Sequence, residues 1–296
     1  MSWQAIARKD FQDSIRSGWV IGLSIVFLVL FVALSYFFAE GVGGAVQQQT
    51  GEQLSSDAFI SLLASFVGLM IPLVAVVLAY ASVAGERDSG TLKLLLALPH
   101  SRRDVVLGKS IGRSAVIVLP ILVGFVAAAI VFLITPVTLE VGNYVAFALL
   151  SALLGIVFVC LAVGVSAASG SRRQAMLGNV GLYVIFALFW GSFAEGLVSL
   201  LDEYTSIGFK TLAQIQLATR LLNPTDAYQS IAAILWTGDA LGARVALFGG
   251  FAAEIYADAL APLPAYFSDP VVALVFLAWL VVPPVLGYLV FRNADL

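Results

Sequence analysis

The residue types that most often carry out chemistry are scarce in this chain, and one short string has the form of a nucleotide-binding motif. Gly108-Lys109-Ser110 matches the last three residues of a phosphate-binding loop. That loop requires a preceding strand and another glycine five residues before Gly108, where Arg103 stands here. We therefore predict a helical turn at these residues, and we expect the chain itself to bind no ATP.

Other catalytic and metal-binding patterns are also missing from the sequence. The single histidine, His100, belongs to no HExxH motif, and no GxSxG motif occurs. One cysteine, Cys160, excludes an internal disulfide. Met1, Met70 and Met176 are too few, even with Cys160 and His100, to relay copper across a bilayer. We predict no catalytic residue, no cofactor site and no metal site.

The composition is that of a protein embedded in lipid. Of 296 residues, 61% are apolar and only 11% are charged, and the mean hydropathy is +1.01. Soluble domains are about a quarter charged. The first 18 residues are polar and mixed in charge, so we expect no cleavable signal peptide. The expected environment is the lipid bilayer, and no nucleic-acid partner is expected.

Six apolar runs are long enough for the roughly 20 residues that a bilayer core requires. Because a backbone in lipid must satisfy its own hydrogen bonds, we predict an all-α polytopic membrane protein with one transmembrane domain over residues 1–296. We expect bends at the prolines inside these helices, chiefly for packing. The predicted spans are residues 19–38, 62–83, 115–134, 145–168, 176–197 and 271–291.

The basic residues predict the orientation of these spans. Twelve of the 15 Lys and Arg residues lie before span one, between spans two and three, between spans four and five, or after span six. Since such residues remain on the cytoplasmic side, we predict a multi-pass plasma-membrane protein with both termini in the cytoplasm.

Residues 1–18 are predicted to form an amphipathic helix on the membrane surface. At 100° per residue, its apolar face carries Trp3, Ile6, Ala7, Phe11 and Ile15, and Asp10 interrupts that face. An ordinary helical lead-in to span one is the alternative.

The outer connections differ in kind. Residues 41–57 are rich in Gly and Gln and predict a flexible connection, whereas residues 201–270 predict two or three helices at the outer surface. For that long outer loop, we expect a helix N-cap at Thr225 or Asp226. No span has a charged residue at its centre, but Glu195 lies near the outer end of span five. It could line an outer vestibule or interface, or contact cargo.

Residues 84–114 hold six of the 15 basic residues in one cytoplasmic loop. We predict a short helix from Gly90 to Leu98, with Ser89 as its N-cap and Pro99 at its end. Its leucines at 92, 95 and 96 share one face, which packs either into the groove of a partner or on this protein's own inner surface. Ser101 to Asp104 form a capping-box pattern that opens a helix running into span three.

This loop resembles the signature of ABC-2 type permease subunits, the six-span membrane halves of ABC exporters. The matching string is Glu86-x-x-x-Gly90-Thr91-Leu92-x-x-Leu95-Leu96-x-x-Pro99, then Arg102 or Arg103, then Gly108-Lys109. Ile6-Ala7-Arg8-Lys9-Asp10 and Leu222-Asn223-Pro224 are similar to the family as well. Ile71-Pro72-Leu73 and Gly90-Thr91-Leu92 look most like the permease of the nitrous oxide reductase maturation system. The motifs cover residues 1–20 and 60–113, and the topology covers the chain.

The resemblance implies an exporter in which two permease chains, a homodimer or a closely related pair, stand on two ATPase subunits that bind ATP and Mg. In the branch named above, transport would serve the maturation of a copper enzyme. The alternative is a membrane scaffold or an unassisted carrier. The implied ATPase-coupling residues are Glu86, Gly90, Thr91, Leu92, Leu95, Leu96, Pro99, Arg102 and Arg103.

Overall fold

The computed structural model describes residues 2–51, 53–97, 101–250 and 252–294. Within them the chain is a helical bundle in which six helical segments are long and apolar enough to cross a membrane. Each contains or closely overlaps one of the six predicted spans, so the predicted polytopic all-α fold is confirmed. The crossing segments are α2 (Gly18–Phe37), α4 (Ser56–Ala79), α7 (Arg102–Leu133), α8 (Val141–Ala168), α9 and α10 together (Arg172–Val184 and Trp190–Tyr204), and α15 (Asp269–Phe291).

The first crossing helix is longer than the sequence predicted. After α2 the chain makes one π-helical turn, Phe38–Gly43, and continues as α3 (Gly44–Thr50), so the flexible connection expected from residue 41 is wrong as far as Thr50. The glycines do not break the helix here, because a π turn absorbs the irregularity and keeps the backbone hydrogen-bonded. Gly51, at φ +76°, ends α3. The two-residue strand β1 (Leu54–Ser55) then pairs in parallel with β2 (Val137–Thr138).

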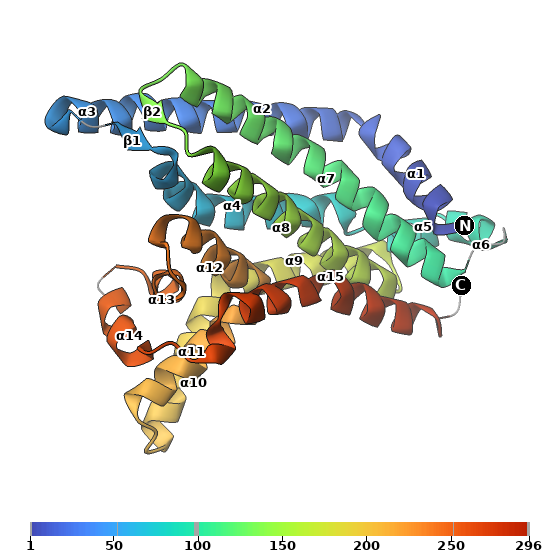
Figure 1. Ribbon diagram of the computed structural model, residues 1–296. Coiled ribbons are helices and arrows are strands. Elements are labelled where there is room, and N and C mark those ends of the chain that lie inside the picture. The colour runs from blue at the N-terminus through green and yellow to red at the C-terminus, as the bar shows by residue number, and fades with distance from the viewer. Residues whose placement is uncertain (1, 52, 98–100, 251, 295–296) are drawn as a thin grey trace.

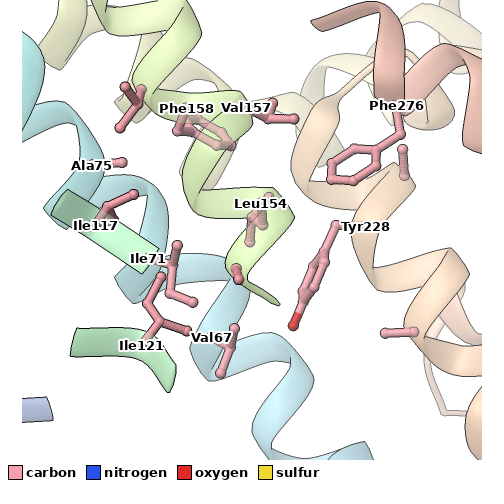
Figure 2. Close-up of a cluster of buried hydrophobic side chains, with 14 of the residues drawn as sticks. Val67, Ile71, Ala75, Ile117, Ile121, Leu154, Val157, Phe158, Tyr228 and Phe276 are labelled. Atoms are coloured by element: carbon pink, nitrogen blue, oxygen red, sulfur yellow. The ribbon is translucent and has the colours of Figure 1, made fainter. Parts of the chain in front are cut away.

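The core of the bundle is built around α8, which packs against α4, α7 and α15. Figure 2 shows side chains from these helices meeting, among them Ile71 from α4, Ile121 from α7, Leu154 and Phe158 from α8 and Phe276 from α15. All five are 0–1% exposed. Burial on every side fixes the positions of these helices relative to one another.

α8 and α15 cross almost backbone to backbone. A Cβ atom added at Gly164 would lie 2.3 Å from the carbonyl oxygen of Pro283, and one added at Gly287 would lie 2.7 Å from Cα of Gly164. Only glycine permits this approach. Pro283 and Pro284 lie inside a helix that continues to Phe291, so the proline pair belongs to a tight helix crossing.

The long loop between spans five and six is largely helical. It forms α11 (Phe209–Leu221), α12 (Pro224–Thr237), α13 (Ala240–Val245) and α14 (Ala252–Leu260), with 3-10 turns at Ala246–Phe248 and Ala265–Phe267. The N-cap of α12 is Asn223, followed by Pro224 at the first helical turn, and not Thr225 or Asp226 as predicted. A proline fits there because its missing N–H would be unpaired anyway.

α12 does not lie on the surface. It packs against α4, α8 and α15, and Tyr228 on its buried face is fully covered, with its hydroxyl 3.1 Å from Oγ of Ser151. The prediction of helices at the outer surface therefore needs correction for α12, which inserts between the membrane-crossing helices.

The two ends of the bundle carry different elements (Figure 1). One end, here called the terminal end, carries both chain termini, the start of α1 (Ser2–Ile15), and the short helices α5 (Ala84–Asp88) and α6 (Thr91–Ala97). The opposite end carries α3, β1, β2, α13 and α14.

Candidate functional site

α5 at the terminal end is held by a different partner at each of three consecutive charged residues. Glu86 Oε1 lies 2.8 Å from Nζ of Lys109 on α7. Arg87 donates to the carbonyl of Ser169 just after α8, at 2.8 Å. Asp88 accepts a 2.8 Å hydrogen bond from the backbone N–H of Arg172 at the start of α9. Three neighbouring side chains thus connect one short helix to three spans.

Further contacts tie α5 to α8 and α15. The backbone N–H groups that open α5, at Val83 and Ala84, both donate to Oγ of Ser166 on α8 at 3.1 Å. The guanidinium of Arg87 also lies 5.5 Å from the centre of the Phe291 ring, at the end of α15. These contacts tie α5 to both helices.

Arg102, a predicted coupling residue, caps the end of α15. Its Nη1 donates to the carbonyls of Phe291, Arg292 and Ala294, at the helix end where carbonyl groups need partners from outside the helix. The predicted capping box at the start of α7 is confirmed, with Ser101 and Asp104 bonding each other's backbone N–H. Arg103 points outward and is exposed.

α6 presents a different face from the one that leucine spacing predicted. Leu92 is 1% exposed and belongs to the protein's own core, and Leu95 packs partly against that core. For Leu92 the interpretation as a knob for a partner's groove is wrong, and the alternative left open is correct. The side chain of Leu96 and the whole of Pro99 lie outside the described residues. Among the α6 residues whose exposure the structure describes, Thr91, Lys93 and Ala97 are exposed.

The turn between α5 and α6 depends on glycine. Gly90 has φ +76°, a backbone conformation that other residues rarely adopt. Ser89 is the C-cap of α5 and not the predicted N-cap of α6, which begins only after Gly90. Its hydroxyl lies 2.8 Å from that of Thr91. Gly90 thereby sets the direction in which α6 leaves α5.

A buried charge cluster links α1 to this segment. Lys109, 3% exposed, contacts Glu86 and also lies 3.6 Å from Asp10 of α1. Nε of Arg113 lies 2.9 Å from the other oxygen of Asp10. The sequence did not predict this cluster. From the sequence, Asp10 only interrupts the apolar face of the first helix, and Lys109 only belongs to a string that resembles part of a nucleotide-binding motif. The signal was available, because a carboxylate on an apolar helix face needs a buried cation.

α1 lies directly on α7 because two glycines allow it. A Cβ atom at Gly108 would be 2.8 Å from Ile6 and from the Trp3 carbonyl, and one at Gly112 would be 2.8 Å from the Ala7 carbonyl. The string that begins at Gly108 is therefore a helix-packing site. Of the predicted apolar face, Ile6 and Ala7 are buried, and Trp3, Phe11 and Ile15 are half-buried.

The Leu222-Asn223-Pro224 string joins the loop helices to two spans. Asn223 is fully buried, and its Nδ2 donates to the carbonyl of Phe186 within the π turn Ile185–Phe189 of span five. Nε1 of Trp279 on α15 donates to the carbonyl of Leu222. A π turn changes the regular hydrogen-bond pattern of a helix and leaves carbonyl groups without their usual partners. The Asn223 amide donates a hydrogen bond to one of these carbonyl groups.

Two arginines, the half-buried Arg220 and the fully buried Arg244, stabilise the loop helices. Arg220 pairs with Asp226 at 3.0 Å, and burial raises the pKa of that carboxyl although Arg220 opposes the shift. Arg244 is fully buried, and its guanidinium reaches Phe267, Ser230 and Asp269. Burial lowers the pKa of Arg244, and Asp269 opposes that shift. Arg244 is thus a structural anchor of the loop helices.

Glu195 lies on α10 and is exposed. Burial raises the pKa of the Tyr256 hydroxyl, and the charge of Glu195 raises it further, which places the carboxylate near α14. The Tyr256 hydroxyl also bonds Oε1 of Gln216. Glu195 therefore borders the loop helices at the opposite end of the bundle.

A six-span bundle with a braced helical segment between spans two and three defines a polytopic membrane subunit. The chain belongs to the ABC-2 family of transporters: the family model described as ABC-2 family transporter protein matches residues 4–296. It is 31% identical to the probable ABC transporter permease protein NosY of Stutzerimonas stutzeri over 294 residues, 97% of each chain. It is 33% identical to the protein of the same name from Pseudomonas aeruginosa over 236 residues, 76% of this chain and 79% of that one. The chain is therefore a membrane subunit of an ABC transporter, which makes it a transport component.

Proposed function

We propose that this chain couples ATP hydrolysis on a separate ATPase subunit to export of a cargo across the plasma membrane. The observation that supports this most strongly is the bracing of α5, whose residues Glu86, Arg87 and Asp88 contact α7, the end of α8 and the start of α9. A partner that moves α5 and α6 would move three spans at once. Such rigid connection is what a coupling element requires.

The ATPase contacts the exposed side of α6 and the neighbouring α7 start in this proposal. The exposed residues here are Thr91, Lys93, Ala97 and Arg103. Leu92 is buried in the core of the protein and holds α6 in place. ATP and Mg bind on the partner. Two ATPase subunits serve two permease chains, which we propose to be identical copies.

The proposal is tested by purification in mild detergent from the native membrane, asking whether an ATPase subunit co-purifies in equal amount. Lys93→Glu reverses a charge on the exposed side of α6, and we expect at least a tenfold loss of bound ATPase, about 1.4 kcal/mol. Lys210→Glu, the same reversal at an exposed site on α11, is the matched control and should retain it. Leu95→Glu is less informative because Leu95 packs on the core.

Two results would overturn the coupling role. If the chain purifies alone from its own membrane, a scaffold or unassisted carrier becomes the better description. If the ATPase co-purifies equally with wild type, Lys93→Glu and Thr91→Glu, it binds elsewhere on the chain.

We also propose that both termini lie in the cytoplasm. Support comes from the 12 basic residues in the segments that lead into or out of the spans at the terminal end. In a Cys160→Ala background, Lys93→Cys should react with a membrane-impermeant maleimide only after the cells are opened, and Lys210→Cys in intact cells. The reverse pattern would invert the topology.

We also propose that the exported cargo serves the maturation of a copper enzyme. This rests on the resemblance of the segments at Ile71 and Gly90 to the nitrous oxide reductase branch, and on two relatives named NosY. The soft ligands are too sparse for bare copper, so another cargo is expected. Deletion of the chain should leave nitrous oxide reductase with less copper, and unchanged copper content would refute this role.

A further inference from the structure

A cavity with a partly polar lining lies near the terminal end, where α1 turns into α2. It has a volume of about 520 Å³, and its lining comes from the α1–α2 turn, the end of α4, Arg113 in the first half of α7 and the start of α9. Ser14, Ser17, Ser82, Arg113 and Arg172 contribute polar side chains. Neither the ATPase-coupling segment nor any role described above uses this cavity.

Several hydrogen-bond donors around the cavity have capacity to spare. A guanidinium has five N–H groups. Arg172 uses one of them for the hydroxyl of Tyr80, and Arg113 directs Nη1 to the Leu78 carbonyl and Nε toward Asp10. Ser82 is 4% exposed, and its hydroxyl has no hydrogen-bond partner within the described part of the chain. The two guanidinium groups are donors suited to a phosphate, and the buried Ser82 hydroxyl is a further donor in the cavity wall.

One acceptor stands in the same wall. Asp13, on the exposed side of α1, also lines the cavity. A carboxylate would repel a bare phosphate, but it would attract an ammonium group beside that phosphate. We propose that the cavity binds a phospholipid headgroup carrying both a phosphate and a primary amine, as in phosphatidylethanolamine.

The position of the cavity fits a lipid. Most of its lining residues lie where α1, α2, α4 or α9 begins or ends, and in a six-span protein the ends of the spans lie near the lipid headgroups. Val77 of α4 lines the cavity and is 54% exposed on the apolar outer surface of the bundle. A headgroup held here can therefore leave its acyl chains on membrane-facing surface.

The experiment is native mass spectrometry of the detergent-purified chain after delipidation, titrated with phosphatidylethanolamine, phosphatidylglycerol or phosphatidylcholine. We expect phosphatidylethanolamine to bind most tightly. Arg172→Ala should weaken it about tenfold through loss of a charge-assisted hydrogen bond. Ser82→Ala should have a smaller effect in the same direction. Arg173→Ala removes an exposed neighbour that does not line the cavity, and it should bind as wild type does.

Asp13→Asn separates the amine contact from the phosphate contacts. It should weaken phosphatidylethanolamine and strengthen phosphatidylglycerol, so that the preference reverses. Inorganic phosphate that displaces the lipid at equal concentration would identify a site for free phosphate instead. Equal binding of all three lipids by wild type, or equal lipid binding by wild type and Arg172→Ala, would overturn the proposal. Normal melting temperatures of the variants show that they are folded.

Discussion

At the scale of single residues, the buried charge of Lys109 has the clearest effect on how the helices are arranged. Lys109 is almost completely covered, and it lies between carboxylates from α1 and α5. A buried ammonium is tolerated only when opposite charges and hydrogen bonds compensate for lost water. The cluster therefore specifies one arrangement of α1, α5 and α7, which is the arrangement that the coupling proposal requires.

Lys109→Met keeps most of the length of the side chain and removes its charge. We expect it to lower the free energy of unfolding by about 2–4 kcal/mol, because Asp10 and Glu86 lose a partner. The value is below that of a fully buried pair, since Glu86 is 32% exposed. The measurement is thermal unfolding in detergent, together with ATPase stimulation by cargo or lipid in the assembled complex.

Two further variants separate positioning from bulk packing. Lys109→Arg keeps the charge and should recover part of the coupling, whereas Lys93→Met removes an exposed lysine and should leave stability unchanged. Equal stability of Lys109→Met and wild type would mean that the cluster does not hold the three helices together.

At the scale of whole elements, two helix pairs are set by glycine: α1 on α7, and α8 on α15. In both, backbone atoms of one helix occupy the space that a side chain of the other would need. The contact of α1 with α7 is the easier of the two to test, because α1 is a separate helix that precedes the first crossing helix. Close packing, not apolar character alone, holds it there.

Gly108→Ala should loosen α1 from α7. The added methyl group would lie 2.8 Å from Ile6 and from the Trp3 carbonyl, so the two helices must separate. We expect a cost of about 1–3 kcal/mol, and faster proteolysis at the basic residues of α1. Gly22→Ala is the control, since a Cβ atom there meets nothing within 4 Å. If both variants behave alike, the glycine contact is not what positions α1.

The sequence predicted those elements whose signal is local. Length and apolar composition were sufficient for six spans, and Ser101 with Asp104 was sufficient for the start of α7. Features that depend on distant partners were missed. The burial of Leu92 depends on core side chains that are distant in the sequence. The position of α12 depends on its packing against α4, α8 and α15. No spacing within α6 or α12 carries that information.

At the scale of the whole molecule, the spans differ greatly in how much of their surface the chain itself covers. Two-thirds of the most apolar stretch of α8 is buried, but only 11% of that of span five is. Span five therefore presents a long apolar face, formed by α9 and α10, that a second copy or lipid must cover. Glu195 interrupts this exposed surface near the opposite end, and a carboxylate in contact with lipid would be costly.

We therefore predict that the two copies of the proposed homodimer bring Glu195 near its symmetry mate. In a Cys160→Ala background, Glu195→Cys should be crosslinked to itself by bifunctional maleimides, and the shortest effective reagent reports the separation. Crosslinking by simple oxidation would place the residue in a direct interface, because a disulfide requires Cα atoms within about 7 Å. Crosslinking only by long reagents would indicate a vestibule between the copies. Gln48→Cys, exposed on α3, is the control and should remain uncrosslinked. A dimer in which Glu195→Cys reacts with no reagent would show that span five faces lipid and that the copies meet elsewhere.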